Sequence, residues 1–91
     1  GADMVVFEMV PADLAKEITA NFSVPTVGIG AGPDTDAQVL VWHDLADFPA
    51  GGHRARFVRQ FGAVGEALGK AASDYKRAVH EGEFPAEEHS F

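Results

Sequence analysis

The sequence contains no cysteine and few basic residues. Without cysteine, no disulfide framework and no thiolate metal site can form, and nothing points to an oxidising compartment. Seven Lys and Arg residues stand against fourteen Asp and Glu residues, a formal net charge of -7. A surface of this sign repels a phosphate backbone, so we expect no nucleic-acid partner.

Long apolar runs are also absent. Each apolar stretch is far shorter than the roughly 20 residues that cross a bilayer, and no basic N-terminal region precedes an apolar one. We therefore expect a cytoplasmic protein with no membrane contact. The 46% hydrophobic and 23% charged composition is typical of a folded chain. Ninety-one residues can form one small core, which further chain segments would normally complete. Gly1-Ala2-Asp3 resembles a helix-to-strand turn, so we expect the sequence to begin inside a fold.

Three short apolar runs predict strands that are buried on both faces, as in a parallel sheet. They are Met4 to Val10, Thr26 to Ile29 and Val39 to Trp42. A helix follows the first run, because Pro11 suits a first helical position and apolar residues recur at helical spacing through Asn21. The alternation indicates an α/β fold of parallel units. Three strands cannot close a barrel, which typically needs about 250 residues.

The second half predicts a loop followed by a long helix. Residues 47–53 contain Pro49, Gly51 and Gly52, which favour a loop. The helix should run from about Ala55 to His80. Its apolar positions alternate steps of four and three: Phe57, Phe61, Val64, Leu68, Ala71, Tyr75 and Ala78. We divide the chain into strand-helix units over residues 1–53 and the long helix with its polar tail over residues 54–91.

Glu8 is the most informative position. An ionised carboxylate in an apolar strand is expensive to bury unless it is paired or neutralised. Glu8 shares one face with Met4 and Val6 and lies near the carboxyl end of its strand, where parallel α/β folds place their active sites. The pattern supports two readings equally, a general base and a structural ion pair.

Other polar or glycine-rich segments favour structural roles. The run Gly28 to Gly32 could approach a phosphate, but Pro33 replaces the third glycine of a dinucleotide fingerprint, so we favour a tight turn. For His43 we favour a structural hydrogen bond over catalysis or metal binding. Glu87 to His89 lacks ligand spacing and reads as a solvated or docking tail. We therefore predict no metal ligand.

The predicted long helix carries two further features. Gly62, Gly65 and Gly69 weaken it by about 1 kcal/mol each, which favours docking against another helix over a frayed end. Three arginines cluster where the helix should begin. They could form a surface charge network, which we favour, or a site for an anionic substrate tail. They are Arg54, Arg56 and Arg59.

Four ordered blocks are more specific than any single motif. They are Phe7 to Pro11, Pro25 to Gly32, Asp36 to Asp44 and Phe84 to Phe91. Together they span nearly the whole chain and resemble the C-terminal part of ketopantoate hydroxymethyltransferases, most closely the actinobacterial members. The resemblance implies the C-terminal third, about three β/α units, of a (β/α)8 barrel of the phosphoenolpyruvate/pyruvate superfamily.

The resemblance also implies a reaction. The family transfers a hydroxymethyl group from 5,10-methylenetetrahydrofolate to 3-methyl-2-oxobutanoate, giving ketopantoate for pantothenate and coenzyme A synthesis. Magnesium binds the keto acid and stabilises its enolate. The glutamate of the first block is the base that removes the C3 proton, a role that carries over to Glu8. The family is oligomeric and uses its last helix for subunit contacts, so we expect a homo-oligomer.

Two departures from the family pattern matter. Ala37 replaces a glycine, which would cost about 1 kcal/mol if its φ were positive. The family's magnesium ligands lie in the other part of the barrel, so we expect the isolated 91-residue chain to be inactive. The alternative is a truncated product that acts only as an oligomerisation or binding module through the long helix.

Overall fold

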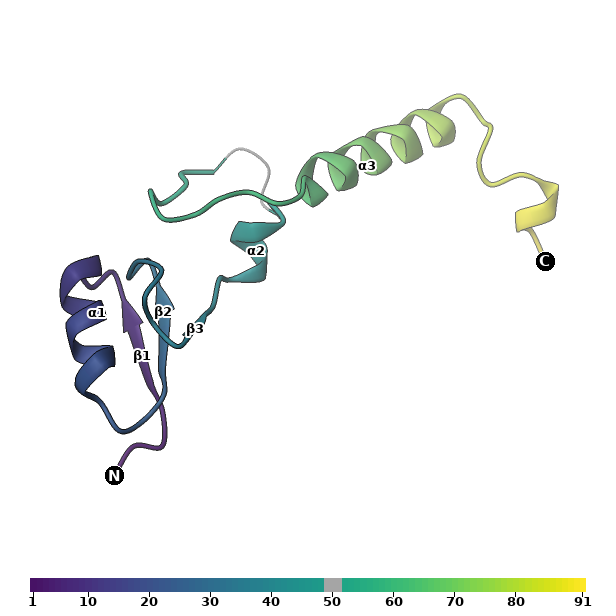
Figure 1. Cartoon of the computed structure of the whole chain (residues 1–91). Helices are drawn as coiled ribbons and strands as arrows, with labels where there is room; N and C mark the ends of the chain where they lie inside the picture. Colours follow the sequence, from purple (N-terminus) through teal and green to yellow (C-terminus); the bar gives the residue numbers. More distant parts are fainter. Residues whose placement is uncertain (49–51) are drawn as a thin grey trace.

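The structure is a computed structural model that describes residues 1–48 and 52–91 (Figure 1). Strands come first and the longest helix comes late, as the alternation of patterns predicts for an α/β chain. The elements in chain order are β1 (Val5–Glu8), α1 (Ala12–Asn21), β2 (Thr26–Ile29), β3 (Ala37–Gln38), α2 (Trp42–Leu45), α3 (Val64–His80) and the 3-10 turn η1 (Glu87–His89).

The strands form one parallel sheet in the order β1-β2-β3. Val5 pairs with Thr26 and Glu8 pairs with Ile29, so β1 and β2 end at the same edge. The backbone N–H of Met9 donates to the carbonyl of Ile29 at 2.9 Å and extends this pairing by one residue. The predicted parallel arrangement and the bounds of β2 are therefore confirmed.

The core lies between the sheet and α1. Phe7, Ala15 and Ala31 are buried there, and Ile18 packs against them. The helix begins at Ala12, one residue later than predicted, with Pro11 as the residue that precedes it. Because Phe7 faces α1, period-two alternation directs its neighbours in β1 away from the helix.

The opposite face of the sheet is uncovered by the described residues. Val6 is 58% exposed, and Met4 and Glu8, which share its face, are exposed too. The prediction that β1 is buried on both faces is therefore wrong for this chain. A strand in a parallel sheet needs a layer on each side to be fully buried, and here α1 supplies one layer.

A buried polar network holds the amino end of β2. Thr26 is fully buried, and its backbone N–H donates to the Asp36 carboxylate at 2.8 Å. The Asp36 N–H bonds in return to the Thr26 hydroxyl at 3.2 Å, and the Thr19 hydroxyl lies 2.9 Å from the same oxygen. Buried polar groups are stable when they are paired in this way. The network places Asp36 beside β2 and so sets where β3 begins.

The third predicted strand, Val39 to Trp42, is wrong. The strand is Ala37–Gln38, two residues earlier, and Trp42 opens α2 instead. Asp36 anchors the chain directly before this short strand, while a short apolar run cannot by itself distinguish a strand from a helical segment. Ala37 is extended and is not among the described residues with positive φ, so the expected backbone cost does not arise.

The long helix is shorter than predicted, because it begins at Val64 rather than near Ala55. Residues 52–63 form no helix or strand. The backbone N–H groups of Phe61 and Gly62 both donate to the carbonyl of Leu45, at 2.6 and 3.1 Å. In a helix that began near Ala55, these two N–H groups would instead donate to the carbonyls of Phe57 and Val58, so the observed bonds exclude that helix. Of the predicted loop at 47–53, residues 49–51 lie outside the described residues.

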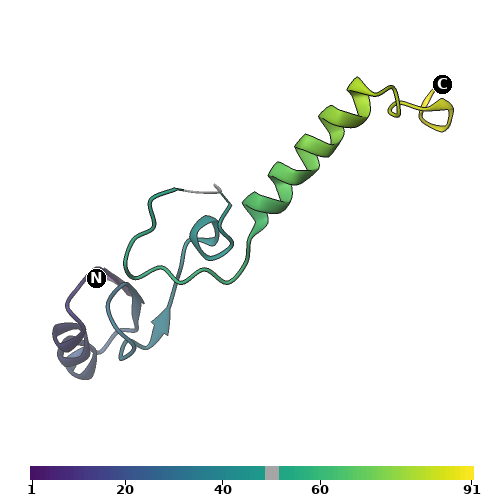
Figure 2. The same ribbon diagram turned by 90° about the horizontal axis from the view of Figure 1, so that it is seen from above.

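The last helix, α3, projects away from the sheet in both views (Figures 1 and 2). The radius of gyration is 21.4 Å, against about 12 Å for a compact domain of this length. Leu68 and Tyr75 are 56% and 61% exposed. Within residues 1–48 and 52–91, no helix is long and apolar enough to cross a membrane. Among the described residues, the apolar side of α3 meets the tail through an edge-to-face contact of Tyr75 with Phe84 at 5.7 Å, and Leu68 remains exposed.

Candidate active-site cleft

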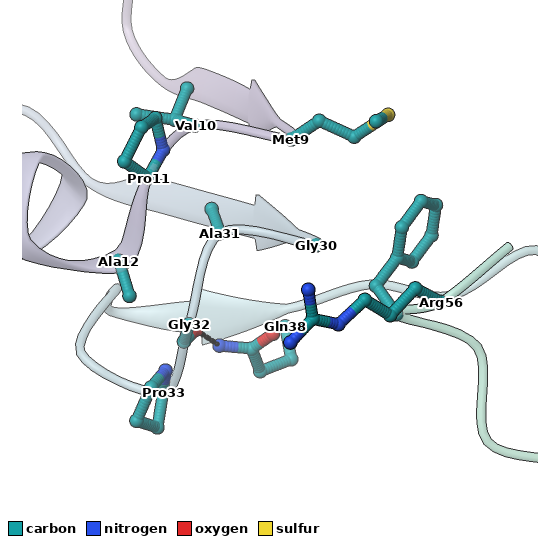
Figure 3. Close-up of a pocket in the computed structure, with 11 residues that line it drawn as sticks. Met9, Val10, Pro11, Ala12, Gly30, Ala31, Gly32, Pro33, Gln38 and Arg56 are labelled. Atoms are coloured by element: carbon teal, nitrogen blue, oxygen red, sulfur yellow. Dashed lines mark hydrogen bonds between the residues drawn. The ribbon is translucent and has the colours of Figure 1, made fainter.

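A cleft of about 910 Å³ lies at the carboxyl ends of the parallel strands (Figure 3). In open parallel α/β sheets this edge is where ligands bind. The turn after β1 and the start of α1 form one side, and the loop after β2 forms another. The lining residues are Met9, Val10, Pro11, Ala12, Gly30, Ala31, Gly32, Pro33, Gln38, Arg56 and Phe57.

The loop after β2 can pass through this space because it contains glycine. Gly30 and Gly32 have φ of +66° and +79°, which L side chains rarely adopt. A Cβ on Gly30 would lie 2.8 Å from the ring of Phe57, and one on Gly32 would lie 2.5 Å from the Cβ of Ala12. The side-chain amide of Gln38 donates to the carbonyl of Gly32 at 2.9 Å. The predicted tight turn after the second strand is therefore confirmed.

Glu8 lies beside the cleft rather than in its lining. It ends β1, is exposed, and occupies the sheet face opposite α1. Its carboxylate makes no hydrogen bond or ion pair with the described residues, so they provide no partner for the structural ion pair. The predicted burial of Glu8 is wrong here, because nothing described covers this face. The next residue, Met9, has φ of +53° and turns the chain into the cleft.

The histidine candidates lie away from the cleft. His43 sits in α2, with its ring 4.9 Å from Trp42 and 5.3 Å from Phe48. His89 in η1 accepts a hydrogen bond at Nδ1 from the backbone N–H of Ala86 at 3.0 Å. Within the described ranges, no three His, Asp or Glu side chains converge in a way that could hold a metal ion. The structural hydrogen bond favoured for His43 is not formed by its side chain among the described residues, and aromatic contacts take its place.

The three arginines were predicted to lie where the long helix begins. This position is wrong, because α3 begins at Val64. Arg54 forms an ion pair with Asp47 at 3.0 Å. Arg59 places its guanidinium 5.0 Å from the centre of the Phe61 ring. Arg56 alone reaches the cleft (Figure 3). The three neighbours in sequence therefore have three different surroundings.

Phe57 carries no sequence signal that marks it as a cleft residue, and Arg56 is marked only as one of three clustered arginines. Arg56 and Phe57 reach the strand ends because residues 52–63 are irregular and turn back toward the sheet (Figure 1). The helical spacing of Phe57 predicts the opposite, a place on α3. Gln38 could have been found, because it closes a strand at the edge where the other strands also end.

Comparison with known proteins gives consistent matches. Residues 1–87 match the family model described as ketopantoate hydroxymethyltransferase. The chain is 64% identical to the protein named 3-methyl-2-oxobutanoate hydroxymethyltransferase of Corynebacterium jeikeium strain K411, 62% to that of Corynebacterium diphtheriae and 60% to that of Mycolicibacterium vanbaalenii. Each match covers 100% of this chain and 32%, 35% and 32% of these relatives.

The chain therefore spans about a third of the length of the curated relatives it matches. These shares agree with the predicted size of the segment relative to a whole barrel. The finer prediction, that the segment is the C-terminal third, is not confirmed by the matches.

We predict that Gly32→Ala destabilises the protein, because the new Cβ meets Ala12 and the positive φ disfavours a side chain. The conformation alone costs about 1–2 kcal/mol. Gly69→Ala in α3 is the matched control, because nothing lies within 4 Å of its added Cβ. Thermal denaturation of the complete protein should give a lower Tm for Gly32→Ala alone. An unchanged Tm for Gly32→Ala would contradict the described turn.

Proposed function

The chain belongs to the ketopantoate hydroxymethyltransferase family, and we propose that it is part of an enzyme that hydroxymethylates 3-methyl-2-oxobutanoate. The names of its relatives give the acceptor keto acid. The proposed donor, 5,10-methylenetetrahydrofolate, rests on the resemblance of the four sequence blocks. The product would be ketopantoate, on the route to pantothenate and coenzyme A.

The observation that carries the catalytic assignment is the position of Glu8. In a (β/α)8 barrel the helices lie outside, so strand residues that face away from them line the interior. Phe7 packs toward α1, so Glu8 would take an inward position at the carboxyl end of β1 in a closed barrel. Catalytic residues of such barrels come from these strand ends. We assign Glu8 as the general base that removes the C3 proton of the keto acid.

The described residues do not fit a magnesium site. They bring together no three His, Asp or Glu side chains that could hold a cation. We therefore place the magnesium ligands in the two thirds of the relatives' length that this chain does not span. The residues of the present chain would supply the base and one side of the substrate cleft.

We also propose that α3 forms a contact between copies of the complete protein. Its apolar residues follow helical spacing and remain exposed, with Val64 and Leu68 at 41% and 56%. Gly65 is buried at the start of the helix, whereas Gly69 has open space around it. A helix with an apolar side normally owes most of its stability to packing on that side. Contact between copies accounts for the exposed apolar side of α3. The exposure therefore gives no separate support to the alternative that the chain is an inactive oligomerisation or binding module.

Replacing Glu8 by Gln in the complete enzyme should slow exchange of the substrate C3 proton for deuterium by at least about 100-fold, as expected for loss of a general base. Binding of the keto acid should change little, because the amide keeps the size of the carboxylate. NMR of 3-methyl-2-oxobutanoate in deuterated water measures the exchange. The control is Glu17→Gln, an exposed change on α1. Unchanged exchange in Glu8→Gln would remove Glu8 from this role.

The isolated 91-residue chain should have no transferase activity, because its described residues hold no metal site. The assay is formation of ketopantoate from the keto acid and 5,10-methylenetetrahydrofolate with added magnesium. The complete enzyme serves as the positive control. Magnesium-dependent turnover by the purified chain would contradict this expectation.

Leu68→Glu should weaken subunit association in the complete protein, because it places a charge on the apolar side of α3. Ser73→Glu is the matched control, since Ser73 lies on the opposite side of the helix at helical spacing and is also exposed. Sedimentation velocity should show smaller species for Leu68→Glu and the native size for Ser73→Glu. Native size for both variants would rule out α3 as the contact.

A further inference from the structure

Arg56 is the only charged side chain among the described residues that line the cleft. The remaining lining is apolar or backbone, apart from Gln38. The Gln38 amide is already engaged, because it donates to the carbonyl of Gly32 at 2.9 Å and to the hydroxyl of Thr35 at 3.0 Å. A polar ligand entering this space therefore meets one cationic group in an apolar setting, which favours an anion at that point.

The fold delivers Arg56 and Phe57 to the cleft together. A turn at these residues is closed by the backbone N–H of Val58, which donates to the carbonyl of Ala55 at 3.0 Å. The Phe57 ring rests against the backbone of Gly30, so closely that a side chain there would collide with it. The aromatic ring is thus held at the edge of β2, and the neighbouring guanidinium projects into the cleft (Figure 3).

The other arginines of this segment have contacts of their own. Arg54 is paired with Asp47, and Arg59 lies over Phe61. Arg56 makes no side-chain hydrogen bond or ion pair with residues 1–48 or 52–91, and it is exposed. A guanidinium presents a planar pair of donors that matches a carboxylate, which a lysine ammonium does not. Arg56 therefore has the chemistry and the freedom to bind a carboxylate.

We propose that Arg56 and Phe57 form a subsite for a ligand that carries a carboxylate beside an aromatic ring. This inference rests on the proposed function and assigns to the subsite the p-aminobenzoyl-glutamate part of the folate co-substrate. The volume of about 910 Å³ suits such a ligand and far exceeds a small aliphatic keto acid. Met9 lines the same cleft and directly follows Glu8, so an occupant lies beside the proposed base.

Binding of p-aminobenzoyl-glutamate to the complete enzyme, measured by isothermal titration calorimetry, tests the proposal. Arg56→Gln should weaken this binding about tenfold or more, as expected for a lost hydrogen bond to a charged group. Binding of p-aminobenzamide, which lacks the carboxylate, should change little. Phe57→Leu should weaken both ligands. The matched control is Arg59→Gln, which removes the same charge three residues away and should leave both affinities unchanged.

Two results would overturn the proposal. One is equal affinity of the native enzyme and Arg56→Gln for p-aminobenzoyl-glutamate. The other is a loss confined to 3-methyl-2-oxobutanoate, which would assign Arg56 to the keto acid carboxylate. If Arg56→Gln fails to fold, Arg56→Met takes its place, and unchanged affinity for p-aminobenzoyl-glutamate in that variant would equally contradict the subsite.

The binding measurement involves no turnover, which keeps it separate from the proposed function. A native enzyme that binds p-aminobenzoyl-glutamate but forms no ketopantoate would contradict the proposed reaction alone. The opposite outcome is that the native enzyme forms ketopantoate and that Arg56→Gln does so with unchanged kinetics for the folate co-substrate. That outcome would contradict the subsite alone.

Discussion

The strands β1 and β2 are paired in parallel in one register, and α1 covers one of their two faces. This pairing brings the ends of both strands to the same edge, where the turn after β1 and the glycine loop after β2 enclose the cleft. The packing of α1 on one face of the sheet determines which way the side chains of β1 point. Because Phe7 packs against α1, Glu8 must take the uncovered face, and the proposed catalytic role depends on that orientation.

Local sequence signals predicted the parts of the fold that local forces determine. The strand at Thr26–Ile29 and the tight turn after it agree with the prediction, because a buried strand followed by glycines leaves the chain few alternatives. The third strand and the start of α3 were misplaced for a different reason. Contacts distant in sequence decide both, namely Thr26 with Asp36 and Leu45 with Phe61.

The residues of the candidate site also fall into those that the sequence marks and those that only the fold brings into place. Glu8 could be found from the sequence, since a carboxylate near the end of an apolar strand is unusual. Arg56 could be noticed as one of three neighbouring arginines, but nothing in their spacing separates it from Arg54 and Arg59. Only the return of residues 52–63 toward the strand ends distinguishes it. The exposed face of the sheet also differs from the prediction, because α1 covers one face and none of the described residues covers the other.

The central claim is that Glu8 faces the interior of a closed barrel. A crystal structure of the complete enzyme with bound 3-methyl-2-oxobutanoate tests it most directly. The account predicts that the Glu8 carboxylate points inward, within about 3.5 Å of the substrate C3 or one water molecule away from it. A Glu8 side chain directed to the outer helix layer, or to solvent outside the barrel, would contradict the account.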